Sequence, residues 1–367
     1  MQPYADQDLL KAHADTAAVD YLKLQPFYVD LAEVVGRIIK QSLEGREVKI
    51  HSVQSRAKDA ASFAVKAAMP SEEDPSKPKY TNPLHEITDL AGVRIITHFL
   101  STLSDVDDML RTEFDIVEKS NKGMLLIEAD RFGYQSIHYL LKLKNDRSQL
   151  AEYQRFAGSI VEVQVRTILQ HAWAEIEHDI QYKSSLTIPT EIRRRFVALA
   201  GMLELADREF QAIDDANSTL ETVAKTSVEA GNLSGIEITP KALKLFLDGK
   251  LGPDGRMSGW NYDWTARLLK TLGFRDLLQV EEAIAPHDDH RLSIILQGSR
   301  QGQLARFEMM LQAALGEDWN NKHPWRGSYW ENRRRMQLEK MKANGITTGT
   351  FNIESPTSGT IADDQPK

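Results

Sequence analysis

The stretch Ile160-Val-Glu-Val-Gln-Val-Arg-Thr167 alternates apolar and polar side chains without a break. Because successive side chains of an extended chain point to opposite faces, its three valines share one face. Glu162, Gln164 and Arg166 share the other face. Strict alternation of this kind predicts a β-strand with one buried face. The polar face of such a strand usually meets solvent, so the segments around it decide whether this one does.

The segments on both sides of this strand show helical and extended patterns in turn. Helical patterns predict helices over residues 28–43, 59–66, 104–114, 168–183 and 192–213. Extended patterns predict further strands over residues 48–53, 92–99, 114–119 and 136–144. We therefore expect an α+β fold, with a small mixed β-sheet flanked by helices, for a first domain over residues 1–226.

The remainder of the chain has a different pattern. A polar stretch with Gly and Ser predicts a linker over residues 227–237. Residues 238–345 have the pattern of a mostly α-helical domain, in which only Leu292–Leu296 also fits a short strand. Residues 346–367 are rich in Thr, Ser, Gly and Asp, which predicts a disordered tail.

The composition excludes several classes of function. The 367 residues contain no cysteine, which excludes disulfides, a thiol nucleophile and cysteine-ligated zinc. A net charge of −8 argues against a general polyanion binder but leaves room for local basic pockets. The chain shows neither a secretory signal at its start nor a run of about 18 consecutive apolar residues. We therefore expect a cytoplasmic protein that does not enter a membrane.

Basic residues gather where one predicted strand ends and a helix begins. Arg56 and Lys58 are two residues apart and point the same way. Lys66 lies two turns into the helix that Asp59 is expected to cap, with Ser62 one turn before it on the same face. With the backbone amides of the helix N-terminus, these cations can surround a polyphosphate, although no glycine-rich Walker loop precedes them. The alternative is a basic surface in solvent.

Two carboxylates accompany these cations. Asp89 comes just before a strongly apolar predicted strand, where it could hold Mg²⁺. Arg94 lies on that strand and would be costly to bury unpaired, so a salt bridge to Asp89 or Glu162 is the alternative. Two carboxylates and several cations near strand ends are what magnesium-dependent phosphoryl transfer requires.

The motifs that carry these residues resemble those of a known family. In chain order they are SRAKDAASFAVK (55–66), ITDLAGVRII (87–96), FGYQSIHY (132–139), VEVQVRT (161–167) and HAWAEIEHDIQYK (171–183). They are similar to the successive motifs of the synthetase domain of the RelA/SpoT family, which makes the alarmones ppGpp and pppGpp. The resemblance covers residues 25–215, and its last motif is closer to the small stand-alone synthetases than to the long bifunctional enzymes.

The resemblance implies transfer of a pyrophosphoryl group from ATP to the 3′-hydroxyl of GDP or GTP. On the donor side it implies that Arg56, Lys58 and Lys66 bind the ATP phosphates, with Ser62 beside them. Arg56 and Arg94 would flank the adenine.

The same resemblance assigns the metal and the acceptor side. Asp89 and Glu162 would coordinate Mg²⁺, and Glu162 would also accept the proton of the attacking hydroxyl. Tyr134 would stack on the guanine. The remaining residues implied on the acceptor side are His138, Gln164 and Arg166.

Two departures from the family motifs leave the identity of the acceptor molecule open. The family usually has an asparagine where this chain has Phe132. It also often has a lysine in the preceding loop, which this chain lacks; Arg131 is the nearest cation. A second hypothesis is therefore a toxic relative, as in toxin–antitoxin or phage-defence systems, that pyrophosphorylates the 3′ end of tRNA. Arg193, Arg194 and Arg195 could contact its phosphates, or simply form a solvated helix face. A third hypothesis is an inactive nucleotide sensor, which the intact Asp89 and Glu162 pair disfavours.

The function of the C-terminal region is less defined by its sequence. His287-Asp-Asp-His290 contains the dipeptide of HD-type metal hydrolases but lacks their further ligands. WNYDW (260–264) and WRGSYW (325–330) bring large aromatics together, either in a helical core or at an interface. We hypothesise that this region regulates the synthetase by folding onto it or by receiving a protein partner. The oligomeric state is left open.

Overall fold

The computed structural model describes residues 2–121, 136–183, 190–253 and 259–353. Packing contacts divide the chain into two compact units, residues 1–214 and 215–367, and each is described by itself. This division falls inside a long helix, α8 (Thr190–Glu229), which also contains position 226, the expected end of the first domain.

The first unit is built on a five-stranded mixed sheet with the strand order β1-β2-β5-β4-β3. The strands are β1 (Ile50–Ala57), β2 (Ala91–Thr97), β3 (Phe114–Asn121), β4 (Ile137–Leu143) and β5 (Val161–Thr167). β2 and β5 are parallel, and the other neighbouring pairs are antiparallel. The expected α+β fold with a small mixed sheet is confirmed.

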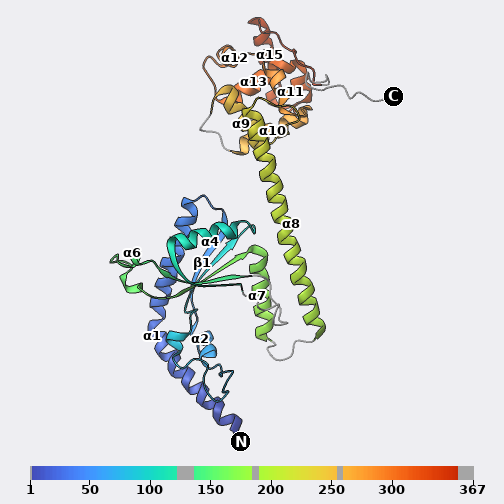
Figure 1. Cartoon of the computed structure of the whole chain (residues 1–367). Helices are drawn as coiled ribbons and strands as arrows, with labels where there is room; N and C mark the ends of the chain where they lie inside the picture. The colour runs from blue at the N-terminus through green and yellow to red at the C-terminus, as the bar shows by residue number, and fades with distance from the viewer. Residues whose placement is uncertain (1, 122–135, 184–189, 254–258, 354–367) are drawn as a thin grey trace. The chain divides into compact units, whose positions relative to one another are not determined.

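Two helices cover the apolar face of this sheet (Figure 1). They are α1 (Gln2–Gly45) and α4 (Thr102–Glu113). The valines of β5 are buried against them, as the alternation predicts, and Leu31, Ile39 and Leu110 belong to the same core. At Gly36 α1 lies close against β1: a Cβ there would lie 2.1 Å from Ser55 Oγ and 3.5 Å from Ser55 Cβ, so a larger residue would require the Ser55 hydroxyl to rotate away.

Other helices meet the sheet at the polar face and at its ends. α2 (Ala60–Ala67) follows β1 and is capped by Asp59, whose side chain accepts a hydrogen bond from the Ser62 amide. α3 (Pro83–Glu86) precedes β2, and α6 (Asn145–Ser148) and a 3₁₀ turn (Gln154–Phe156) precede β5. α7 (Ile168–Lys183) continues directly from β5.

α8 differs in two respects from its sequence-based prediction. The helix continues to Glu229, into the linker that was expected over residues 227–237, and residues 230–239 connect it to α9. The apolar residues of α8, spaced by three and four from Ile192 to Ile213, predict a packing face that is partly used, since Phe196 contacts Trp173 with ring centroids 5.2 Å apart. Phe210 and Ile213 are at least half exposed in the single chain.

The second unit is a helical bundle, as expected. Its helices are α9 (Pro240–Leu251), α10 (Gly259–Leu272), α11 (Leu277–Ile284), α12 (Asp289–Gln297), α13 (Gln303–Leu315), α14 (Glu317–Lys322) and α15 (Tyr329–Ala343). α13 is buried along most of its length and forms the centre of the core.

Two segments of the second unit depart from expectation. Leu292–Leu296 lies in α12 and not in a strand, because Asp288 caps the helix start and Gly298 ends it in the left-handed conformation. Residues 346–353, expected in a disordered tail, pack on the unit: the Phe351 amide donates to the Ala314 carbonyl, and Ile353 is buried. Residues 354–367 lie outside the described residues. No described helix has both the length and the apolar character needed to cross a membrane.

Candidate active site

Strand register places the polar side chains of the sheet on one face. Arg56 pairs with Gly92, and Gly92 pairs with Glu162 across the parallel strands. One step along, Arg94 pairs with Gln164, and Gln164 pairs with His138. Residues two apart on a strand share a face, so all of these side chains lie on the face opposite the valine core. The polar face of β5 therefore looks onto a cluster of charged groups.

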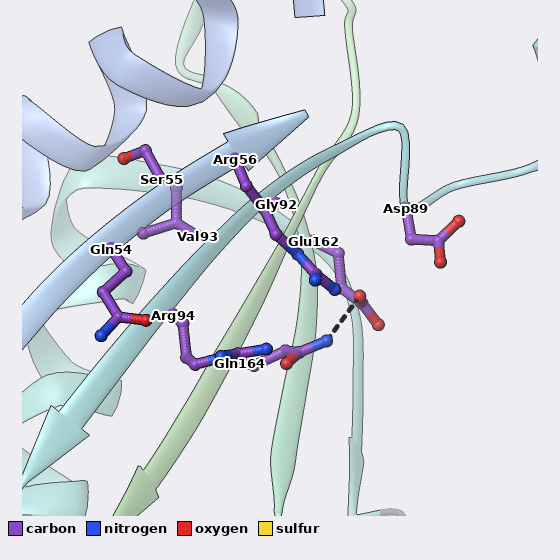
Figure 2. Close-up of a pocket in the computed structure, with 9 residues that line it drawn as sticks. All are labelled: Gln54, Ser55, Arg56, Asp89, Gly92, Val93, Arg94, Glu162 and Gln164. Carbon is purple, nitrogen blue, oxygen red and sulfur yellow. Dashed lines mark hydrogen bonds between the residues drawn. The ribbon is translucent and has the colours of Figure 1, made fainter. Parts of the chain in front are cut away.

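A pocket of about 130 Å³ opens over this face. Figure 2 shows Arg56, Arg94 and Gln164 reaching it from three strands, and Asp89 from the loop before β2. Gly92 lies between Arg56 and Glu162 in the register and has no side chain to fill the space between them. Residues that were predicted from three separate motifs are thus brought to one pocket.

Asp89 is held by the two lysines that were expected to bind phosphate. Lys58 Nζ donates to Asp89 Oδ2 over 2.8 Å, and Lys66 Nζ lies 3.1 Å from Oδ1. Burial raises the pKa of the Asp89 carboxyl, but the hydrogen bond and charge of Lys58 and the charge of Lys66 outweigh it, so the pKa lies below its ordinary value. The alternative of an ion pair between Asp89 and Arg94 is wrong, since the lysines take that role.

The position of Lys58 depends on α1. Its carbonyl accepts hydrogen bonds from the Tyr21 hydroxyl over 2.5 Å and from the Gln25 amide over 3.1 Å. The ring of Tyr21 stacks on Phe63 of α2, with centroids 4.4 Å apart. Burial raises the pKa of the Tyr21 phenol to about 12, so it stays protonated and can donate. No motif indicated Tyr21 or Gln25, because their contact with residue 58 is created only by the fold.

Glu162 is buried on the central strand and is oriented by its neighbours. His138 Nδ1 donates to Oε1 over 2.8 Å, and Gln164 Nε2 donates to Oε2 over 2.9 Å. A carboxylate accepts only, so the proton of this His138 contact resides on Nδ1. The alternative of a salt bridge from Arg94 to Glu162 is wrong: Arg94 donates instead to Glu175 Oε1 of α7, over 2.9 Å.

Positive charge is concentrated beside these carboxylates. Burial, together with the nearby positive charge of Arg94, lowers the pKa of Arg166 to about 10, and its Nε donates to Ser136 Oγ over 3.0 Å. Among the described residues, Arg56 makes no ion pair or side-chain hydrogen bond. Guanidinium groups with spare donors, preorganised in a partly buried pocket, are suited to bind phosphate oxygens.

The structure does not bring every predicted residue to the pocket. Ser62 is exposed on α2 and does not line it. Tyr134 lies outside the described residues, as do Arg131 and Phe132. Glu175, in contrast, contacts Arg94 although only the HAWAEIEHDIQYK motif as a whole had drawn attention to it.

Two further sets of candidate residues lie elsewhere. Arg194 is exposed, and Arg195 pairs with Glu191 along α8 over 3.2 Å; the side chain of Arg193 is not described. In the HD-like segment, Asp288 caps α12 and Asp289 pairs with Arg306, so both carboxylates have structural roles. Within the described ranges, no group of three or more His, Asp or Glu residues could hold a metal by itself.

Comparison with known sequences finds a family match over the residues that form this site. Residues 55–187 match the family described as "Region found in RelA / SpoT proteins". GTP pyrophosphokinase YjbM of Bacillus subtilis (strain 168) is 31% identical over 172 residues, which are 45% of this chain and 72% of that protein. GTP pyrophosphokinase YwaC of the same organism is 28% identical over 127 residues, 35% of this chain and 58% of that protein. The chain thus spans less than two thirds of YwaC.

Solved structures overlap with about half of the chain. The crystal structure of small alarmone synthetase 1 from Bacillus subtilis covers 55% of this chain and 98% of its own, at 24% identity and a TM-score of 0.45. The same enzyme bound to its product pppGpp covers 52% of this chain and 93% of its own, at 27% identity and a TM-score of 0.41. The family match leaves the second unit unassigned.

Proposed function

Because the chain belongs to the RelA/SpoT family, we propose that it transfers the pyrophosphoryl group of ATP to the 3′-hydroxyl of GDP or GTP. The observation that carries this proposal is the meeting of Asp89 and Glu162 with Arg56 in one pocket, with Lys58 and Lys66 on Asp89. The matched relatives are named GTP pyrophosphokinases, which supports the same reaction.

The donor side of the pocket would bind the triphosphate of ATP. Arg56 has spare donors, and Lys58 and Lys66 can exchange part of their interaction with Asp89 for contacts to phosphate oxygens. Arg94, held by Glu175, would flank the adenine. These cations would also counter the negative charge that develops on the transferred group.

A magnesium ion fits the carboxylates of this pocket. Mg²⁺ is usually bound by one or two carboxylates together with substrate phosphates and water, so Asp89 and Glu162 would suffice. Asp89 Oδ1 is buried and, although near Lys66, lacks an aligned hydrogen bond, which leaves it capacity to coordinate an ion. When bound, the ion would neutralise charge on the phosphates.

Glu162 would serve as the proton acceptor for the nucleophile. The 3′-oxygen of the acceptor forms a bond to the β-phosphorus of ATP, and the bond from that phosphorus to the oxygen bridging to the α-phosphate breaks. AMP leaves with the electron pair, and the proton of the 3′-hydroxyl passes to Glu162. The hydrogen bonds from His138 and Gln164 keep the Glu162 carboxylate oriented for this step.

The proposal is tested by incubating the full chain with ATP labelled on its β-phosphate, Mg²⁺ and one of four acceptors: GDP, GTP, ATP or bulk tRNA. We expect label on GDP or GTP and release of AMP. Label on tRNA instead would support the toxic-relative hypothesis, and no transfer to any acceptor would support an inactive sensor. Either of these outcomes overturns the proposed acceptor.

A further inference from the structure

The second unit contains a pocket that the synthetase site does not explain. It has a volume of about 280 Å³ and is lined by side chains of α12, α13, α14 and α15 and the segment between the last two. This volume lies just below the range of about 300–1,000 Å³ typical of ligand pockets. It is therefore sized for one ring system with a small substituent.

Two opposite charges line this pocket without contacting each other. Glu308 of α13 and Arg334 of α15 both line it, and neither forms an ion pair with any described residue. Arg334 is only 8% exposed, and its buried Nε has no hydrogen-bond partner. Its Nη2 donates to the Trp325 carbonyl over 2.9 Å, which fixes the guanidinium plane. Buried charges left unpaired are costly, and a ligand between them would satisfy both.

Glu308 is available as a hydrogen-bond acceptor at neutral pH. Burial raises the pKa of its carboxyl to about 6, while the charge of Arg334 acts in the opposite direction. The group is thus mostly ionised at pH 7 and has four lone-pair positions with no described donor. A ligand edge with two adjacent N–H donors would suit it.

Aromatic rings form the other walls. Trp319 is buried, whereas Trp325 and Trp330 are 47% and 46% exposed. Trp325 is supported from behind by Trp264, with ring centroids 5.1 Å apart. The Arg333 guanidinium lies 5.5 Å from the centre of the Trp330 ring, at the rim. Large flat walls of this kind favour a planar heteroaromatic ring over an aliphatic ligand.

We propose that this pocket of the second unit binds the guanine base of a guanine nucleoside or nucleotide. Guanine presents N1–H and N2–H₂ side by side, which would donate to Glu308, and the acceptors O6 and N7, which would receive hydrogen bonds from Arg334. Adenine has the acceptor N1 beside its N6 donors. The lone pair of N1 would face the Glu308 carboxylate, which is also an acceptor, so the two would repel. Arg333 would contact a 5′-phosphate at the rim.

The test is a titration of the full chain with guanosine and adenosine, followed by tryptophan fluorescence and by calorimetry. Guanosine lacks phosphates, which reduces binding through the cations of the first unit. We expect guanosine to bind, and adenosine to bind at least about 10-fold more weakly, since sites built to hydrogen-bond a ligand reject analogues that cannot pair.

Two variants assign the binding to this pocket. Glu308→Gln removes the charge but keeps the shape, and it relieves an unpaired, half-buried charge, so the unit should stay folded in a thermal melt. It should weaken guanosine binding at least about 10-fold. Glu339→Gln, at an exposed position of α15, is the matched control and should bind as the unaltered chain does.

The readout is binding and not transfer, so its outcome is separate from that of the proposed synthetase reaction. The assignment is overturned if guanosine gives no binding, if adenosine binds equally well, or if Glu308→Gln binds guanosine unchanged. Unchanged binding by Glu308→Gln would show that guanosine binds at a different site of the chain.

Discussion

At the scale of single residues, Asp89 joins the lysines of the proposed ATP-binding side of the pocket. It neutralises Lys58 and Lys66 while ATP is absent, and its pKa is held below the ordinary value by these lysines despite burial. It therefore fixes the ends of both lysine side chains beside its own carboxylate, and it stays ionised at neutral pH. A residue in this position can affect turnover without being needed to recognise ATP.

The first prediction concerns the two carboxylates. Asp89→Asn and Glu162→Gln each remove a ligand charge of the proposed metal, and we expect each to lower turnover at least about 100-fold. ATP should still bind measurably, because the cations around the pocket are retained. The assay is labelled transfer at saturating Mg²⁺ together with ATP-binding calorimetry. The control is Asp105→Asn, at an exposed position of α4 on the other face of the sheet. Near-normal turnover of Asp89→Asn or Glu162→Gln would show that the carboxylate concerned has no part in the mechanism.

The second prediction concerns Glu175, which makes no proposed contact with substrate. Glu175→Ala frees Arg94, and loss of one such hydrogen bond costs about 0.5–1.5 kcal/mol. We expect the KM for ATP to rise several-fold while kcat changes little, and Glu175→Gln, which can still accept the hydrogen bond, to lie closer to the unaltered chain. The control is Glu204→Gln, which alters an exposed ion pair within α8. A loss confined to kcat would show that Glu175 does not position the adenine side.

At the scale of helices and strands, α1 positions part of the proposed ATP-binding side of the pocket. Tyr21 and Gln25 fix the carbonyl of Lys58 just after β1, and Gly36 allows the same helix to lie close against β1. The site thus depends on a helix that shares no motif with it.

The third prediction tests the hydrogen bond from Tyr21 of α1 to the carbonyl of Lys58. Tyr21→Phe removes only the hydroxyl that donates to Lys58, and its ring can still stack on Phe63, so the fold should be kept. We expect kcat/KM for ATP to fall several-fold, in line with about 1 kcal/mol for one hydrogen bond. Steady-state kinetics measures it, and circular dichroism checks the fold. Unchanged kinetics would mean that the neighbouring backbone alone positions Lys58.

The fourth prediction concerns the pH dependence of the second unit. Burial and the charge of Arg334 lower the pKa of His323 to about 4, and its Nδ1 accepts from the Trp325 amide, which requires the neutral ring. Its stabilising contribution is complete above about pH 6.5 and is lost as the pH falls toward 4, by roughly 3 kcal/mol. Glu308, with its pKa raised to about 6, acts oppositely: stability increases as the pH falls through 6 to 4.5, by about 2 kcal/mol.

Removing Glu308 should therefore expose the effect of His323. Between pH 7 and pH 4, the free energy of unfolding of Glu308→Gln should fall about 2 kcal/mol further than that of the unaltered chain. Chemical denaturation followed by tryptophan fluorescence reports mainly on this unit, which holds five of the six tryptophans. Parallel losses in both proteins would show that Glu308 is not buried as an ionisable group.

A helix or strand can be predicted from the sequence when residues within the segment itself determine it, and not when contacts with distant segments do. The alternation around Val163 predicts its strand because one face is buried along the whole segment. The register that sets Gly92 beside Glu162 is a property of the assembled sheet, so the charge pattern suggested that Asp89, Arg94 and Glu162 meet but could not give their pairing. The sequence left Leu292–Leu296 open between helix and strand because a short apolar run fits both, and the caps of α12 decide for the helix.

At the scale of the whole molecule, the chain combines a synthetase-like unit with a second unit that has its own core. Large aromatics remain accessible on the second unit, including Trp260, which is 74% exposed, and the two half-exposed tryptophans of its pocket. Exposed tryptophans are enriched where proteins or ligands bind. We therefore retain the proposal that the second unit regulates the first, through its own ligand or through a protein partner.

The fifth prediction tests this regulation by truncation after Asn217. The cut leaves the first unit complete and removes the last turns of α8, where Ala224 and Val228 belong to the core of the second unit. If the second unit shifts a two-state equilibrium of the synthetase, its removal should change specific activity, or toxicity on expression, by at least several-fold. The assay compares labelled transfer by both chains, with circular dichroism and a thermal melt to show that the shorter chain is folded. The regulatory role would be contradicted if the truncated chain is folded and both chains transfer label at the same rate, with and without guanosine. In that case neither the second unit nor its ligand alters the rate, so the unit does not bias the states of the synthetase.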